Sequence, residues 1–313
     1  MVQAPLLAVV QAILEQPTAP FHEDAVRSEI ERQLAELPHV KHGRDEFGNV
    51  VAIFQRGPLA PQFAFAAHMD HPAYVGDAFL GGVPENYRAK KPPTRDFGPF
   101  AMWDLPAFEV AEGLIYSRAC DDLIGCAAII HMLRELEHSG ADAACFALFT
   151  RAEEVGFVGA IHLAKSRRIP TNVTIVSLET SSEKGGPVRM GEGVIVRVGD
   201  RMSVFDSSAT AQLGELAKAR AIPHQRTLMS GGTCEASAYQ LYGYRTTGLC
   251  VALGNYHNCG PDETIAPEYV ATDDVAAMAQ LCGALASAVD LPDPAAVLRT
   301  RMEERMREYE AYF

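Results

Sequence analysis

The sequence predicts an α/β protein, a three-layer αβα sandwich around a mixed, mostly parallel sheet, with a small β-rich insertion. Short apolar runs alternate with segments of helical periodicity along most of the chain, as expected of a sheet covered by helices on both faces. The run from Ala144 to Phe149 is typical of a strand buried on both faces. Residues 76–117 are rich in glycine and proline and lack helical periodicity, so they predict the insertion.

Each side of the insertion has its own predicted elements. Before it, we expect helices at residues 2–15 and 22–37, a hairpin at 40–55 and a strand at 63–67. After it, we expect helices at residues 123–136, 158–167, 207–220, 234–242, 270–289 and 296–312, and strands at 145–149, 173–178, 194–198, 225–228 and 247–253. We therefore assign residues 1–75 and 118–313 to a catalytic domain and residues 76–117 to a lid or oligomerisation segment.

The composition restricts the class of protein. The chain has 313 residues and a net charge of −13, which argues against nucleic acid or an anionic membrane surface as a partner. No apolar run approaches the roughly 18–20 residues of a membrane-spanning helix. Seven cysteines without a CxxC pair, mostly within apolar segments, indicate buried thiols and a cytoplasmic location.

Several polar residues follow the points where apolar strands end. They are His68, Asp70, Asp121, Glu153, Glu154, Glu179 and His257. In open α/β sheets, ligands bind beyond the carboxyl ends of the strands, and these residue types bind metals. Taken alone, Glu153 and Glu154 are better explained as solvated glutamates that open a helix. Five such positions together favour an open catalytic site, in which a pair of metals needs a bridging carboxylate and a free one to accept a proton.

Six segments resemble a known family. They are AAHMD (66–70), RACDDLIG (118–125), RAEEVGFVGA (151–160), SLET (177–180), SGGTCEA (230–236) and NYHN (255–258). In this order they resemble the co-catalytic zinc aminopeptidases of the M42 type, which are related to the M28 and M20 metallopeptidases. The resemblance implies a cytoplasmic, homo-oligomeric aminopeptidase that acts on short peptides. It also implies two divalent metal ions per chain, zinc or else cobalt or manganese.

The resemblance also implies a role for each site residue. His68, Glu179 and a bridging Asp121 would hold one metal, and Asp121, Glu154 and His257 the other. Glu153 would act as general base and then general acid on a metal-bridging hydroxide. Asp70 would accept a hydrogen bond from His68, and the peptide bond between Asp121 and Asp122 would be cis.

Three departures from the family pattern concern the site and the insertion. Glu179 stands where an aspartate is usual, the insertion is short, and Cys234 with Glu235 replaces a Thr-Asp pattern. Two other functions remain open at this stage. One is an M20-like amidohydrolase, a deacylase or carboxypeptidase with the same metal chemistry, and the other is a non-catalytic binding protein on the same fold.

Overall fold

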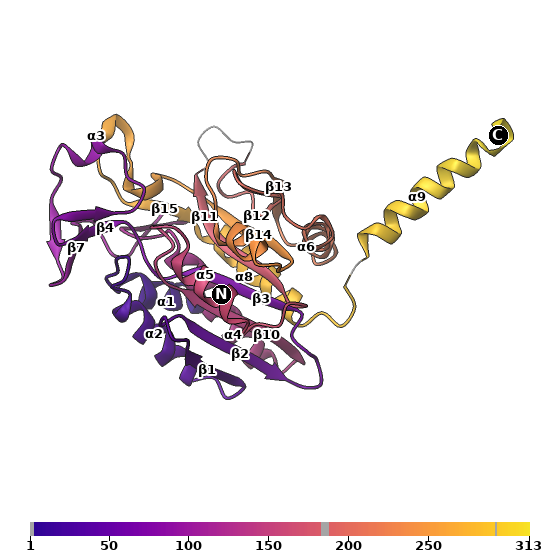
Figure 1. Ribbon diagram of the computed structural model, residues 1–313, viewed down its shortest axis with the longest axis horizontal. Coiled ribbons are helices and arrows are strands. Elements are labelled where there is room, and N and C mark those ends of the chain that lie inside the picture. The colour runs from indigo at the N-terminus through magenta and orange to yellow at the C-terminus, as the bar shows by residue number, and fades with distance from the viewer. Residues whose placement is uncertain (1–2, 183–187, 292) are drawn as a thin grey trace.

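An eight-stranded sheet forms the centre of the computed structural model, which describes residues 3–182, 188–291 and 293–313 (Figure 1). The strands follow the order β1-β2-β10-β3-β11-β14-β12-β13. Their bounds are β1 (Val40–Arg44), β2 (Val50–Arg56), β3 (Phe63–His68), β10 (Ala143–Thr150), β11 (Thr174–Ser182), β12 (Val194–Arg197), β13 (His224–Thr227) and β14 (Thr246–Leu253). The pairs β10/β3, β3/β11, β11/β14 and β12/β13 are parallel and the other three are antiparallel. The predicted mixed sheet is confirmed.

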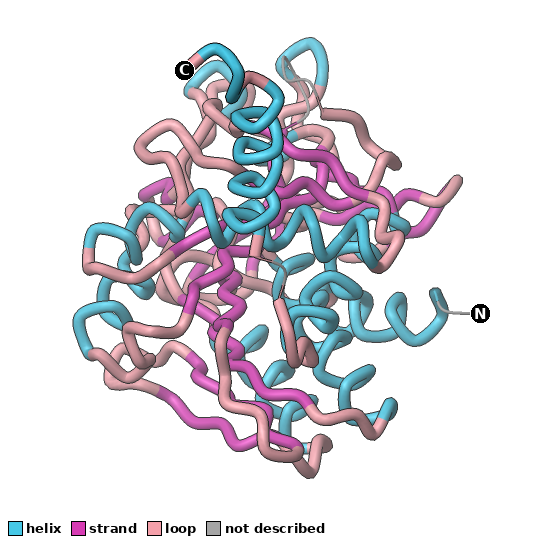
Figure 2. The backbone as a smooth tube through the Cα atoms, turned by 90° about the vertical axis from the view of Figure 1, so that its right-hand side faces the viewer, coloured by secondary structure: helices cyan, strands magenta, loops and turns pink. Residues whose placement is uncertain are grey.

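Helices cover both faces of this sheet (Figure 2). One face packs against α1 (Gln3–Leu14), α2 (Asp24–Ala35), α4 (Leu123–Ser139), α6 (Ser207–Ala219) and α8 (Thr272–Ala286), and the other against α5 (Val158–Ser166) and α7 (Glu235–Leu241). The central strand β3 explains this arrangement, because Phe63, Phe65 and Ala67 belong to the first core and Ala64 and Ala66 to the second. The three-layer prediction is therefore confirmed.

Helix α4 begins immediately after the segment that carries Asp121. The side chain of Asp122 caps it by accepting a hydrogen bond from the backbone N–H of Gly125 at 3.2 Å. At the other end Gly140, with φ of 70°, ends the helix in the left-handed conformation that glycine adopts without steric cost. The helix therefore fixes Asp121 one residue before its N-terminal cap.

Two small antiparallel sheets lie beside the main one. The first has the order β5-β4-β7-β6, from β4 (Ala73–Val75), β5 (Ala78–Leu80), β6 (Thr94–Asp96) and β7 (Phe100–Trp103), with the short helix α3 (Glu85–Arg88) between β5 and β6. The second has the order β15-β9-β8, from β8 (Glu109–Ala111), β9 (Leu114–Ser117) and β15 (Glu268–Ala271). The predicted β-rich insertion is present, and β9 joins it to the segment that leads into α8. Its role as a lid or oligomerisation segment stays a prediction.

The bounds of most predicted elements differ from the structure by a few residues, and two of these differences have a structural consequence. Strand β11 continues three residues beyond Glu179, so this carboxylate lies within the strand. The helix expected from residue 270 begins at Thr272, because Val270 and Ala271 pair with β9. Short 3-10 helices at η1 (Tyr256–Asn258), η2 (Pro261–Glu263) and η3 (Glu310–Tyr312) complete the described chain, together with α9 (Pro294–Glu308). Within the described ranges, every helix is too short or too polar to cross a membrane.

Candidate metal centre

Six charged side chains converge at the carboxyl edge of the central parallel strands. The segments that bring them there are the end of β3 (His68), the β9–α4 connection (Asp121), the β10–α5 connection (Glu153 and Glu154), β11 (Glu179) and η1 after β14 (His257). Strands β10, β3, β11 and β14 are neighbours, so the segments that follow them meet at one place. The side chains are almost fully removed from solvent, with only 1% of His68 and 4% of His257 exposed. All the predicted site residues therefore lie together.

The carboxylate of Asp121 lies between the two imidazoles. Its Oδ1 is 3.5 Å from His68 Nε2, and its Oδ2 is 3.6 Å from His257 Nε2. The peptide bond from Asp121 to Asp122 is cis, as the resemblance implied. Each carboxylate oxygen thus faces a different histidine, which is the placement required of a carboxylate that bridges two metal ions.

Three groups of possible ligands occur at the site, and one of them combines Asp121 with Asp122 and Glu179. His68, Glu153 and Glu179 offer ligand atoms within 4.8 Å of one another, and so do Asp121, Glu154 and His257. His257 Nε2 is 3.3 Å from Glu154 Oε1. Two atoms that each lie 2.0–2.1 Å from a tetrahedral ion are about 3.4 Å apart. The separations therefore suit ligands that share an ion.

Both histidines are oriented by backbone carbonyls. His68 Nδ1 lies 3.1 Å from the carbonyl oxygen of Asp70, and His257 Nδ1 lies 3.2 Å from that of Gly82. A carbonyl only accepts hydrogen bonds, so each Nδ1 is the donor. In the neutral ring Nε2 then carries the lone pair and points at the carboxylates, as in metal-binding histidines.

Three carboxylate oxygens in the site have no hydrogen-bond donor among the described residues. These buried atoms are Asp121 Oδ1, Glu154 Oε1 and Glu179 Oε1. A buried acceptor without a partner is unfavourable, and a cation is the group that would satisfy all three. The donor set of imidazole nitrogens and carboxylate oxygens fits zinc, cobalt or manganese. The residues present therefore fit a pair of divalent ions.

The sequence matches a peptidase family over this same region. Residues 95–281, more than half of the chain, match the family model described as M42 glutamyl aminopeptidase. The chain belongs to the M42 peptidase family. A relative from Acetivibrio thermocellus, named "Putative aminopeptidase", is 29% identical over 131 residues, which are 41% of this chain and 39% of the relative. The match thus spans about two fifths of the length of that curated relative.

Solved structures similar to this M42 chain support the fold. The TET1 peptidase of Pyrococcus horikoshii, described as able to assemble into a tetrahedron or a large octahedral shell, has a TM-score of 0.73 and 20% identity, covering 90% of this chain and 99% of that one. An aminopeptidase from Desulfurococcus kamchatkensis has a TM-score of 0.75 and 18% identity, covering 91% and 95%. The predicted M42 resemblance is confirmed at the level of the family.

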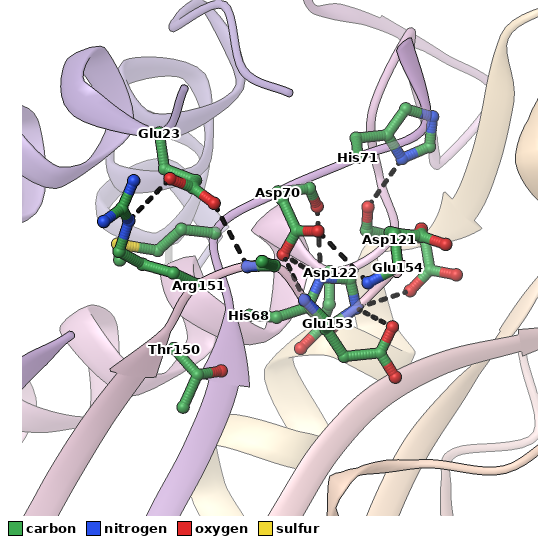
Figure 3. Close-up of polar contacts among 12 residues, drawn as sticks. Glu23, His68, Asp70, His71, Asp121, Asp122, Thr150, Arg151, Glu153 and Glu154 are labelled. Carbon is green, nitrogen blue, oxygen red and sulfur yellow. Dashed lines mark hydrogen bonds and ion pairs between the residues drawn. The ribbon is translucent and has the colours of Figure 1, made fainter. Parts of the chain in front are cut away.

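Asp70 has a larger structural role in this M42 chain than the resemblance implied. Its carboxylate accepts hydrogen bonds from the backbone N–H groups of Glu153 at 2.9 Å and Glu154 at 3.1 Å (Figure 3). The expected contact with His68 is made by the Asp70 carbonyl, while Asp70 Oδ1 lies 3.5 Å from His68 Nδ1. Asp70 therefore orients three of the site residues at once.

Burial raises the pKa of two glutamates in the site, Glu153 and Glu179. It raises the pKa of Glu153 well above its ordinary value, and it raises the pKa of Glu179 to about 8. Burial also acts to raise the pKa of Asp121, but the imidazoles of His257 and His68 beside its two oxygens outweigh it, so that this pKa lies below its ordinary value. The neighbouring rings therefore favour the ionised form of Asp121, whereas burial favours the protonated form of Glu153.

Glu268 positions the backbone of the site, and the sequence analysis did not identify it. Its Oε2 accepts hydrogen bonds from the backbone N–H groups of Cys120 at 2.7 Å and Asp121 at 3.1 Å, and its Oε1 accepts one from His257 at 2.8 Å. His71 adds a second link, because its Nδ1 donates to the carbonyl of Asp121 at 2.7 Å. The only signal in the sequence is the acidic residue that begins the otherwise apolar run of β15.

Proposed function

We propose that the chain is a di-metal aminopeptidase that removes N-terminal residues from short peptides, with zinc as the native metal. The observation that carries the proposal is the position of Asp121, whose two oxygens lie 3.5 and 3.6 Å from different imidazoles. Such a carboxylate is what a pair of metal ions requires as a bridge.

The ligand assignment places Asp121 in both ligand sets and leaves Glu153 out of the group that it forms with His68 and Glu179. We assign His68, Asp121 and Glu179 to one ion and Asp121, Glu154 and His257 to the other. When bound, the two ions would polarise the scissile carbonyl and lower the pKa of a water molecule, which is the chemistry such sites supply. Asp70 would hold the backbone of both neighbouring glutamates in place through its two hydrogen bonds.

Glu153 is the group we assign to proton transfer. Its Oε2 lies 3.9 Å from His68 Nε2, so the carboxylate reaches the centre, and with Asp121 assigned to both ions neither ligand set requires it. It would take a proton from the attacking water and deliver it to the nitrogen of the leaving amine as the C–N bond breaks. Its raised pKa suits this step, because the carboxyl must hold the proton between the two transfers.

Metal analysis coupled to a substrate panel tests this function. Chelator-treated and reconstituted protein would be assayed for metal content and for hydrolysis of free and N-acetylated dipeptides. Two ions per chain with cleavage of free dipeptides only is the expected result. Cleavage of N-acylated substrates only would move the function to the amidohydrolase alternative, and metal binding without turnover of any substrate would favour the binding protein.

Two further expectations belong to this proposal. We propose that the chain self-associates, as the TET1 peptidase of Pyrococcus horikoshii does by its own description. We also propose a cytoplasmic location, which fits the six cysteines buried as thiols at positions 120, 126, 145, 234, 250 and 282.

A further inference from the structure

His71 contacts two of the connections that carry proposed metal ligands. The residue is buried, with 1% of its surface exposed. Its Nδ1 donates to the backbone carbonyl of Asp121 at 2.7 Å (Figure 3), and its Nε2 lies 3.1 Å from the side-chain oxygen Oδ1 of Asn258. Asp121 belongs to the β9–α4 connection, and Asn258 follows His257 in η1. The imidazole therefore links the residue of the bridging carboxylate to the neighbour of another ligand.

The hydrogen bonds of Asn258 determine which of its side-chain atoms faces the ring. Its Nδ2 donates to the carbonyl of Ala266 at 3.3 Å, so Oδ1 is the atom turned toward His71. Exchanging the two amide atoms would place two acceptor oxygens, those of Asn258 and Ala266, against each other. Like the carbonyl oxygen of Asp121, Oδ1 can only accept a hydrogen bond. Both ring nitrogens of His71 therefore face acceptors.

Two acceptors around a buried imidazole require two ring N–H groups. A neutral imidazole carries one N–H, whereas the imidazolium carries two. With a neutral ring, the lone pair of one nitrogen would point at an oxygen, at a separation of either 2.7 or 3.1 Å. A buried polar atom that lacks its hydrogen-bond partner is unfavourable. The surroundings of His71 thus favour the doubly protonated, positively charged ring.

Glu268 holds the same two connections with the opposite charge. Both of its oxygens are acceptors, as in an ionised carboxylate, and they bind the backbone N–H groups of Asp121 at 3.1 Å and His257 at 2.8 Å. His71 acts on the other side, through the carbonyl of Asp121 and the side chain of Asn258. A cationic and an anionic side chain therefore join the β9–α4 connection to η1.

We propose that His71, doubly protonated, is a positioning residue that keeps Asp121 and His257 in register and so supports the ion that both of them would bind. The inference rests on the proposed di-metal function, because the residues that it positions are assigned there as ligands. The other ion shares only Asp121 with this network, so its binding depends on His71 less.

Nitrogen NMR of protein with isotope-labelled histidine tests the charge of the ring. In zinc-loaded protein at neutral pH, His71 should show two ring N–H groups, and its signals are assigned by their loss in His71→Asn. A single ring N–H on His71 would overturn the proposal. The measurement involves no substrate, so its outcome is separate from that of the dipeptide panel that tests the proposed function.

Zinc affinity tests whether the effect is confined to one ion. His71→Asn keeps a donor for the carbonyl of Asp121 but loses the charge and the link to Asn258. In a His68→Ala background, His71→Asn should weaken zinc binding at least tenfold, as expected when a partner of a metal ligand is lost. In a His257→Ala background it should leave the remaining ion almost unchanged. Equal effects in both backgrounds, or no effect in either, would overturn this inference alone, whereas a wild type that bound no zinc would overturn the proposed function as well.

Two substitutions of Asn258 test the direction of its hydrogen bond. Asn258→Asp keeps an acceptor opposite Nε2 and should bind zinc as the wild type does, whereas Asn258→Leu should reproduce the loss seen in His71→Asn. Equal losses in both Asn258 variants would mean that Asn258 donates to a neutral ring, which would contradict the proposal. As a matched control, His42→Asn makes the same chemical change at an exposed position of β1 and should leave both ions unaffected.

Discussion

The side chain of Glu153 illustrates how burial prepares a residue for chemistry. The carboxyl lies in the charged centre, and burial raises its pKa well above the ordinary value. We expect Glu153→Gln to lower kcat by about 10²–10⁴, the usual contribution of a general base or acid. Metal content should stay near that of the wild type, because neither proposed ligand set includes this residue. Elemental analysis and steady-state kinetics would measure both quantities.

A matched control for that prediction is available at Glu46, whose side chain is 97% exposed. Glu46→Gln carries the same chemical change away from the centre and should leave kcat unaltered. Equal activity of Glu153→Gln and the wild type would contradict the proposed role of Glu153.

From the raised pKa of Glu179 we predict how the stability of the metal-free protein depends on pH. Burial raises its folded-state pKa from the ordinary value of 4.5 to about 8. The stabilisation from the protonated form is therefore complete below pH 4.5 and is lost as the pH rises through about 8. The free energy of unfolding of chelator-treated protein should fall over this window, by at most about 1.4 kcal/mol per pH unit for one proton. Urea unfolding at several pH values would measure it.

Glu179→Gln separates this group from its neighbours. The amide does not titrate, so the decline of stability with pH should be shallower in the variant than in the wild type. A decline of the same steepness in both proteins would mean that other carboxyls control the response.

At the scale of the elements, the sequence predicted those features that depend only on the residues of a single strand. The apolar run of 63–67 predicted a buried strand, and the structure places His68, the polar residue that ends it, beside the other predicted site residues. Glu268 could not be predicted in this way. Its partners are backbone N–H groups of the β9–α4 and β14–η1 connections, which are far apart in the sequence and meet only in the folded chain. The hydrogen bond from His257 to the Gly82 carbonyl could not be predicted either, because every residue type has a backbone carbonyl.

The insertion contributes directly to the centre through Gly82. Its carbonyl orients His257, and a Cβ added at Gly82 would lie 3.3 Å from His257 Cε1 and 3.4 Å from Nδ1. The ring or the carbonyl would have to shift. We expect Gly82→Ala to weaken metal affinity by about tenfold, the lower end of what loss of such an orienting contact costs. Titration of the chelator-treated protein with zinc would measure the change.

Gly43 provides the comparison for this substitution. A Cβ at Gly43 has no atom within 4 Å, so Gly43→Ala should bind metal as the wild type does. If both variants bound zinc with wild-type affinity, the hydrogen bond from His257 to the insertion would have no role in the centre.

At the scale of the whole molecule, the centre holds together segments from both halves of the chain. His68 follows a strand near the N-terminal end, and His257 lies almost two hundred residues later. Four acidic side chains, those of Asp121, Glu153, Glu154 and Glu179, lie with them in the centre, and the chain as a whole carries a charge of −13. Without cations, the repulsion between these buried carboxylates opposes folding. With bound cations, the same carboxylates link segments that are far apart in the sequence.

Metal ions should therefore stabilise the entire fold. Zinc at 100 times its dissociation constant should add about 2.7 kcal/mol per site to the free energy of unfolding, provided that the unfolded chain binds it weakly. For a chain of this size the midpoint of thermal unfolding should rise by roughly 5 °C or more. Asp121→Asn should remove most of this rise, because the carboxylate serves both ions, whereas Asp77→Asn, at an exposed position, should retain it. A full rise in the Asp121 variant would place the stabilising metal elsewhere, because no other described carboxylate faces both imidazoles through its two oxygens.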